Sequence, residues 1–271
     1  MKKIYNYFLF KISTTKIAIF FLVIILYQFG MFLNVISRHI QYNLYDLLIE
    51  NFGYLSLFYC ISLFYLIIVY NVCENTNFYK YLFLKFKNKY QVYNANVLFI
   101  FIFAVIVVAF INLVCILQCL NNISFKNIWS PYFFNTMTGS INLVYVAENV
   151  KIITAKLTPL SYVMYSNLFV ILYLFFLSMV FFVSNIFFNN RAISFILVII
   201  LNFMSMFLDS INGIWSKISF TYNIFFISSS LNELNNNSFI ILRIFYWIIL
   251  IFIMYYIGKI LTKKIDYSFG N

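Results

Sequence analysis

Long apolar runs alternate with short polar stretches along the chain, and six of the runs are long enough to cross a membrane. A helix rises about 1.5 Å per residue, so about 20 apolar residues cross the roughly 30 Å hydrocarbon layer of a bilayer. The six predicted spans are residues 17–36, 53–72, 97–117, 162–182, 193–208 and 239–258. The pattern predicts an all-α integral membrane fold in which residues 1–271 form a single transmembrane domain.

The segments between the spans differ in character. Residues 1–16 are basic and partly amphipathic, which predicts a helix lying at the membrane interface, with a plain basic stretch as the alternative. Run 17–36 is too long for a signal-peptide core, and no small-residue cleavage pattern follows, so we expect an uncleaved span. Residues 119–160 carry charge in their centre and are expected to form short interfacial helices or strands. Residues 210–237 predict a re-entrant or surface-lying hairpin, provided that protein covers its broken backbone.

Composition explains where the apolar surface goes. Hydrophobic residues make up 64 % of the chain and charged residues 9 %, and the mean hydropathy is +0.93. A soluble domain is about 45–50 % apolar and about 25 % charged. Lipid must therefore solvate much of this chain. The abundance of Phe, Tyr, Ile, Asn and Lys is typical of an AT-rich bacterial genome, so we expect a multi-pass protein of a bacterial cell membrane.

The basic residues predict the orientation. The net charge is +11, which suits loops on the cytosolic face and nearby anionic lipid headgroups, so membrane lipids and not nucleic acid are the expected partners. With the amino terminus inside, 12 of the 18 Lys and Arg lie in cytosolic segments and 5 in external ones. The positive-inside rule then places both termini in the cytosol.

The motifs of common enzymes are missing. None of the six glycines begins a phosphate-binding loop, and a metalloprotease would need two His ligands where this chain has His39 alone. The four cysteines lie in or at the ends of apolar runs, which is typical of packing residues. We expect no catalytic residue, metal or cofactor, and hence no enzyme. A membrane enzyme stays an alternative, with His39, Glu148 and Asp209 as its candidate residues.

Two charged residues border the membrane region near one face. Asp209 ends the fifth predicted span, and Arg243 lies about one turn inside the sixth. A charge near lipid seeks a partner or extends to the interface. The sequence leaves open a structural ion pair between Asp209 and Arg243 and the extension of Arg243 alone to the surface.

Segment 74–96 is the most basic loop of the chain. Tyr79, Leu82, Phe86 and Tyr90 recur at helical spacing, among the lysines at 80, 85, 87 and 89. An apolar face of this kind fits the groove of a partner protein. It also fits a bilayer surface, and the sequence leaves both alternatives open.

Residues 79–99, YKYLFLKFKNKYQVYNANVLF, resemble the cytosolic coupling helix and the start of the third span in ABC-2 type permeases of bacteriocin and lantibiotic transporters. The resemblance implies a permease subunit that exports a peptide or another hydrophobic or amphipathic substrate. Its implied partners are a separate ABC ATPase subunit and a second permease copy or a homologous permease. The implied ATPase-coupling residues are Tyr79, Leu82, Lys85, Phe86, Lys87, Lys89 and Tyr90. The alternative is a non-transport membrane protein, such as a bacteriocin immunity protein, with its essential residues in 119–160 or 210–237.

Overall fold

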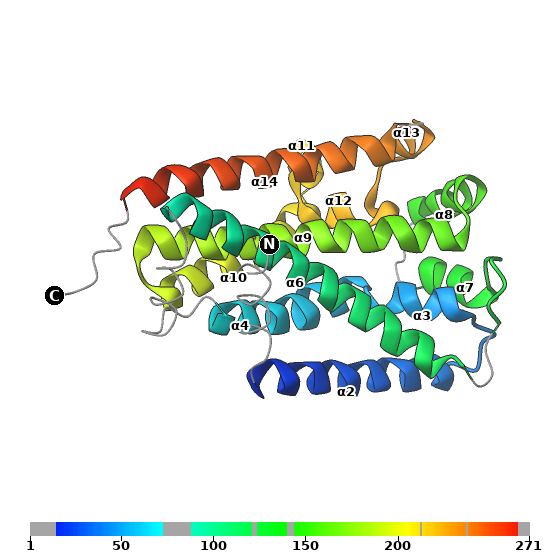
Figure 1. The fold of residues 1–271 in the computed structure, drawn as a ribbon. Coiled ribbons are helices and arrows are strands. Elements are labelled where there is room, and N and C mark those ends of the chain that lie inside the picture. The colour runs from blue at the N-terminus through cyan, green and yellow to red at the C-terminus, as the bar shows by residue number, and fades with distance from the viewer. Residues whose placement is uncertain are drawn as a thin grey trace.

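The computed structural model describes residues 15–72, 88–120, 124–139, 144–211, 213–236 and 238–264, and these ranges contain helices and no strand. Its long helices are α2 (Thr15–Ser37), α6 (Lys89–Gln118), α9 (Pro159–Phe188), α10 (Arg191–Ser210) and α14 (Phe239–Lys264). All five are long and apolar enough to cross a membrane. Helices α2, α9 and α14 run roughly side by side, and α6 crosses the bundle obliquely from α14 toward α2 (Figure 1). The segment 1–14, which holds most of the predicted interfacial helix, lies outside the described residues.

The second predicted span is not one straight helix. Helix α3 (Leu44–Asn51) is followed by a π-helix, η1 (Ser56–Ile61), and by α4 (Ser62–Val72). The two parts are bent by 52°, and taken together they make a sixth candidate span. Asn43 and Asp46 form a capping box that starts α3, nine residues before the predicted start at 53. The predicted span 53–72 covers η1 and α4, and the sequence analysis did not anticipate the bend or the preceding helix α3.

Helices α6, α9 and α10 begin before the predicted spans, and a polar residue caps each of them. Asn88 accepts a hydrogen bond from the Gln91 backbone, so α6 begins at Lys89, eight residues before the predicted span at 97. Thr158 caps α9 with Pro159 in its first turn, and Asn189 ends that helix with a positive φ of 48°. These caps lie outside the apolar runs, so hydropathy alone could not locate the helix ends.

Helix α9 forms the centre of the bundle. In its most apolar 18-residue window, 72 % of residues are buried, against 11 % for α14. It packs against α14, α10, α6 and α4. Aromatic rings pack around the contact with α14: the ring centroid of Trp247 on α14 lies 6.0 Å from that of Tyr173 on α9 and 5.7 Å from that of Phe220, which lies in the connection after α10. Helix α14 thus presents most of its apolar surface outward.

Both long connections fold into short helices. Residues 119–160 contain α7 (Pro131–Gly139) and α8 (Val144–Lys156), in agreement with the helical alternative of the prediction. Residues 210–237 contain α11 (Ile214–Ile218), α12 (Phe220–Ile224), η2 (Phe226–Ser228) and α13 (Leu231–Asn235). All five residues of α12 are buried, and the helix contacts α9, α10 and α14. Protein therefore covers the broken backbone around α12, which meets the condition set for a re-entrant hairpin.

Candidate site between helices α6, α9 and α14

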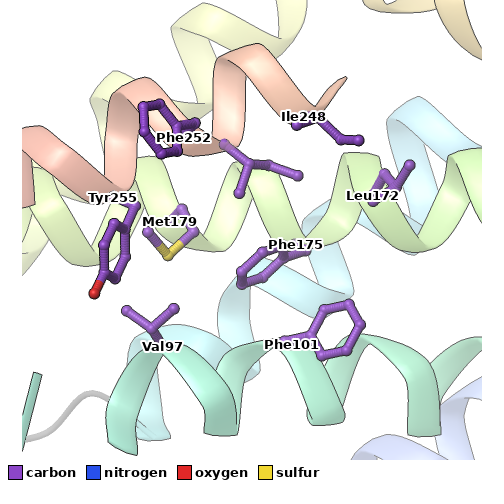
Figure 2. Close-up of a pocket in the computed structure, with 9 residues that line it drawn as sticks. Val97, Phe101, Leu172, Phe175, Met179, Ile248, Phe252 and Tyr255 are labelled. Atoms are coloured by element: carbon purple, nitrogen blue, oxygen red, sulfur yellow. The ribbon is translucent and has the colours of Figure 1, made fainter. Parts of the chain in front are cut away.

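An open apolar groove of about 310 Å³ lies between α6, α9 and α14. Figure 2 shows side chains from the three helices converging on it. The lining residues are Val97, Phe101, Leu172, Phe175, Met179, Ile248, Ile251, Phe252 and Tyr255. Only Tyr255 brings a polar group, so the groove suits hydrocarbon and offers no site for a reaction.

Helical spacing explains why these residues share the groove. Val97 and Phe101 are four residues apart on α6, and Ile248, Phe252 and Tyr255 follow at intervals of four and three on α14. Residues three and four apart lie on one face of a helix. The rings of Phe101 and Phe175 meet edge to face with centroids 5.2 Å apart, which joins α6 to α9 along the groove.

Hydrogen bonds join the first turns of α6 to the last turns of α14 at one end of the groove. The Tyr93 hydroxyl donates to the Tyr255 carbonyl oxygen at 2.9 Å, and the Tyr255 hydroxyl donates to Asn94 Oδ1 at 3.0 Å. Lys89 Nζ donates to the Lys263 carbonyl oxygen at 2.7 Å. We call these three contacts the α6–α14 clasp. Gly258 lies inside it, where an added Cβ would be 2.9 Å from Tyr93 Cε2 and closer still to the Tyr93 hydroxyl.

The clasp includes part of the predicted coupling segment. Lys89 begins α6 and takes part in the clasp, and Tyr90 follows it and is half-buried. Tyr79, Leu82, Lys85, Phe86 and Lys87 lie outside the described residues. The proposed role of these seven residues at an ATPase therefore stays a prediction.

The predicted ion pair between Asp209 and Arg243 does not form within the described residues. Arg243 is only 5 % exposed, so it does not extend to the surface either. Its Nη2 donates to the Phe225 carbonyl oxygen at 3.2 Å and to the Ser229 hydroxyl, and its guanidinium lies over the Phe226 ring. Asp209 instead accepts a hydrogen bond from the Ser219 hydroxyl at 3.3 Å. Both alternatives failed because residues 225–229 fold back onto α14, and sequence spacing cannot show that.

The opposite end of the bundle from the clasp carries α7, α8 and α13, and the two long connections contact each other there (Figure 1). Asn149 of α8 donates from Nδ2 to the carbonyl oxygens of Ile227 and Ser229, at 2.9 Å in both cases. Lys156 Nζ reaches the carbonyl oxygens of Leu234 and Asn235 at 2.7 and 2.8 Å. Figure 1 shows α7, α8 and α13 gathered at this end. We call this layer of short helices the cap.

An ion pair lies within the connection that follows α10. Lys217 Nζ is 2.8 Å from Glu233 Oε1, and the Tyr222 hydroxyl donates to Glu233 Oε2. Partial burial acts to raise the pKa of Glu233, but the hydrogen bonds from Lys217 and Tyr222 outweigh it and lower the pKa below its usual value. The hydrogen bond to Glu233 raises the pKa of Lys217. Both shifts favour the charged pair near neutral pH.

A buried polar node next to the π-helix was missed by the sequence analysis. Asn202 of α10 donates from Nδ2 to the Phe58 carbonyl oxygen in η1 at 3.2 Å and to Ser62 Oγ at 3.3 Å. The Tyr173 hydroxyl of α9 donates to Asn202 Oδ1. Asn202 is fully buried and ties the bent span to α9 and α10. The amide of Asn202 inside an apolar run could have indicated this node, because a buried amide requires hydrogen-bond partners.

The candidate residues of the alternative enzyme are dispersed. His39 follows α2, Glu148 lies on α8, and Asp209 lies near the end of α10. No hydrogen bond or ion pair joins any two of them in the part of the chain that the structure describes. The geometry of these residues therefore favours no reaction.

Among known proteins, the chain has sequence similarity to a distant relative. The chain is 27 % identical over 251 residues to the uncharacterized protein BH0177 of Halalkalibacterium halodurans, covering 92 % of this chain and 88 % of that protein. No family model matches the chain, and no solved structure matches it. The similarity extends over nearly the full length of both proteins, and it assigns no activity.

Proposed function

We propose that this chain is a multi-pass protein of a bacterial cell membrane and the permease subunit of an ATP-driven exporter whose ATPase is a separate chain. The α6–α14 clasp is the observation that supports this proposal best. Segment 74–96 leads directly into α6 at Lys89, and the clasp joins that helix to α14 through Tyr93 and Tyr255. A force applied to the segment therefore reaches two candidate spans at once.

Helix α14 then carries this displacement to the far end of the bundle. It has 26 residues and is therefore about 39 Å long. Near its other end, Trp247 Nε1 donates to the Asn223 carbonyl oxygen at 3.3 Å, and Arg243 holds residues 225–229. In the proposed mechanism, ATP-driven closure of the ATPase moves segment 74–96, and α14 shifts the re-entrant connection at the opposite face. A peptide or other amphipathic substrate leaves along a path between two permease copies.

The proposal is tested by copurification of a tagged full-length chain from cells of its source organism, followed by identification of any ABC ATPase that it retains. We expect the parent to retain the ATPase, and Phe86→Asp and Tyr90→Asp to lose it, because a carboxylate cannot enter an apolar groove. Ile214→Asp is the matched control, since Ile214 is 77 % exposed on α11, a helix that packs against α10 and α12. The proposal fails if the parent never retains an ATPase, or if the two loop variants retain it as the control does.

The cap supports a second candidate function, that of an immunity protein which binds a bacteriocin outside the cell. Such a protein needs an external surface rather than a cytosolic partner, and α8 and the connection after α10 form one layer through Asn149 and Lys156. A bacteriocin sensitivity assay separates the two functions. Immunity predicts that Asn149→Ala and Lys156→Ala abolish protection while Tyr90→Asp retains it. The permease function predicts that Tyr90→Asp abolishes any protection by export.

A further inference from the structure

The groove between α6, α9 and α14 has the chemistry of a lipid-binding site. It lies along the middle of α14, whose apolar surface is mostly exposed: Phe252 is 58 % exposed and Ile248 49 %. In a membrane this groove faces the hydrocarbon layer. A hollow left empty beside it loses dispersion contacts along its whole lining, so a hydrocarbon chain entering it is favoured.

The volume of the groove favours a single chain over a second helix. An α-helix with side chains is at least about 10 Å wide, so a helix could place only a few side chains in a groove of about 310 Å³, whereas an alkyl chain can lie in it along its length. A second copy that docked here by the same face would also bring the lysines of α14 close to their own counterparts. A slender alkyl chain meets neither obstacle.

Basic side chains continue the stripe that lines the groove. Ile248, Phe252, Tyr255 and Lys259 follow one another on α14 at intervals of four, three and four residues, which places Lys259 on the groove-lining face, about 6 Å beyond Tyr255. Lys263 lies one further turn along, and both lysines are exposed. An apolar groove that leads to two ammonium groups complements a molecule with a hydrocarbon chain and an anionic head.

We propose that the groove holds one acyl chain of an acidic phospholipid whose phosphate is bound by Lys259 and Lys263. The lipid would then occupy the seam between α6 and α14 next to the clasp. This inference rests on the membrane insertion contained in the proposed function and is independent of any ATPase or substrate. Loss of ATPase binding and loss of lipid binding are therefore separate results.

Native mass spectrometry of the full-length chain tests the inference, with phosphatidylglycerol and phosphatidylcholine of identical acyl chains as the probes. We expect phosphatidylglycerol to be retained more strongly. Lys259→Gln and Lys263→Gln should each weaken its retention about fivefold, because one lysine near an anionic surface contributes about that factor. Lys126→Gln and Lys151→Gln are the matched controls, since both lysines are exposed but lie in the connection between α6 and α9. Neither control should change the retention of phosphatidylglycerol.

Two further variants test whether the groove holds the acyl chain. Val97→Trp and Ile251→Trp place a bulky ring in the groove from half-buried positions, and each should reduce the retention of both lipids. A variant is interpreted only if it elutes as the parent does. If one of the two variants fails to fold, the other is used for the test. Equal retention of the two lipids by the parent, or no effect of the two lysine variants, overturns the phosphate site. Unchanged retention in a folded groove variant, or loss of a dimer instead of a lipid, overturns the groove as an acyl-chain site.

Discussion

Gly258 is the position where a single methyl group tests the α6–α14 clasp. An added Cβ would lie 2.8 Å from Val183 Cγ2 and 2.9 Å from Tyr93 Cε2, and closer still to the Tyr93 hydroxyl oxygen. Tyr93 cannot easily move away, because it is 1 % exposed, its hydroxyl is bonded to Tyr255, and its ring stacks on Phe182 at 5.8 Å. Gly258→Ala therefore forces the two helices apart.

The expected change in stability follows from three contributions. Overpacking a filled interior costs about 1–3 kcal/mol. Loss of the hydrogen bond from Tyr93 costs about 0.5–1.5 kcal/mol more. The higher helix propensity of Ala offsets about 0.8–1.0 kcal/mol of that cost. We expect Gly258→Ala to lower the free energy of unfolding by about 1–3 kcal/mol.

The assay is reversible unfolding of the purified chain in detergent, with Gly30→Ala as the matched control. Gly30 also lies in a long apolar helix, but no heavy atom lies within 4 Å of an added Cβ there. The control should be neutral or stabilising by up to about 1 kcal/mol. Gly258→Ala combined with Tyr93→Phe should be less destabilised than the sum of the two single variants, since the nearest atom is gone. Equal stability of the Gly258→Ala and Gly30→Ala variants would refute the reasoning.

Three further predictions concern the polar contacts. Asn202→Leu should lower the free energy of unfolding by about 1–3 kcal/mol, because it leaves the buried Tyr173 hydroxyl without its acceptor. An unchanged unfolding midpoint would contradict that role. Arg243→Lys should be less stable than Arg243→Met in the same assay, because lysine keeps a buried charge but offers a single donor centre, whereas methionine removes the charge. The reverse order would show that the charge itself is needed. Glu233 has a lowered pKa when folded, so its contribution to stability is present above its unfolded pKa and is lost as the pH falls through the folded value. Unfolding followed between pH 3 and pH 6, about the normal range of a Glu carboxyl, should show this loss in the parent and not in Glu233→Gln.

The sequence by itself determined the class of the protein and the position of most long helices. Length and apolarity are local properties, so runs such as 97–117 and 162–182 can be recognised without knowing what they contact. The structure places both inside longer helices, α6 and α9. Helix ends were less predictable, because caps such as Asn88 and Thr158 lie outside the apolar runs that mark the spans.

Only the tertiary structure decided which faces of these helices meet. Helices α9 and α14 are apolar on all sides, so no pattern along them shows which residues line the groove. The π-helix of the second span is joined to α10 by Asn202, 144 residues beyond its acceptor Phe58. The partner of Arg243 depends in the same way on how residues 225–229 fold back onto α14. Contacts of this kind depend on the packing of the whole bundle, because each polar group inside it takes the partner that the fold brings near.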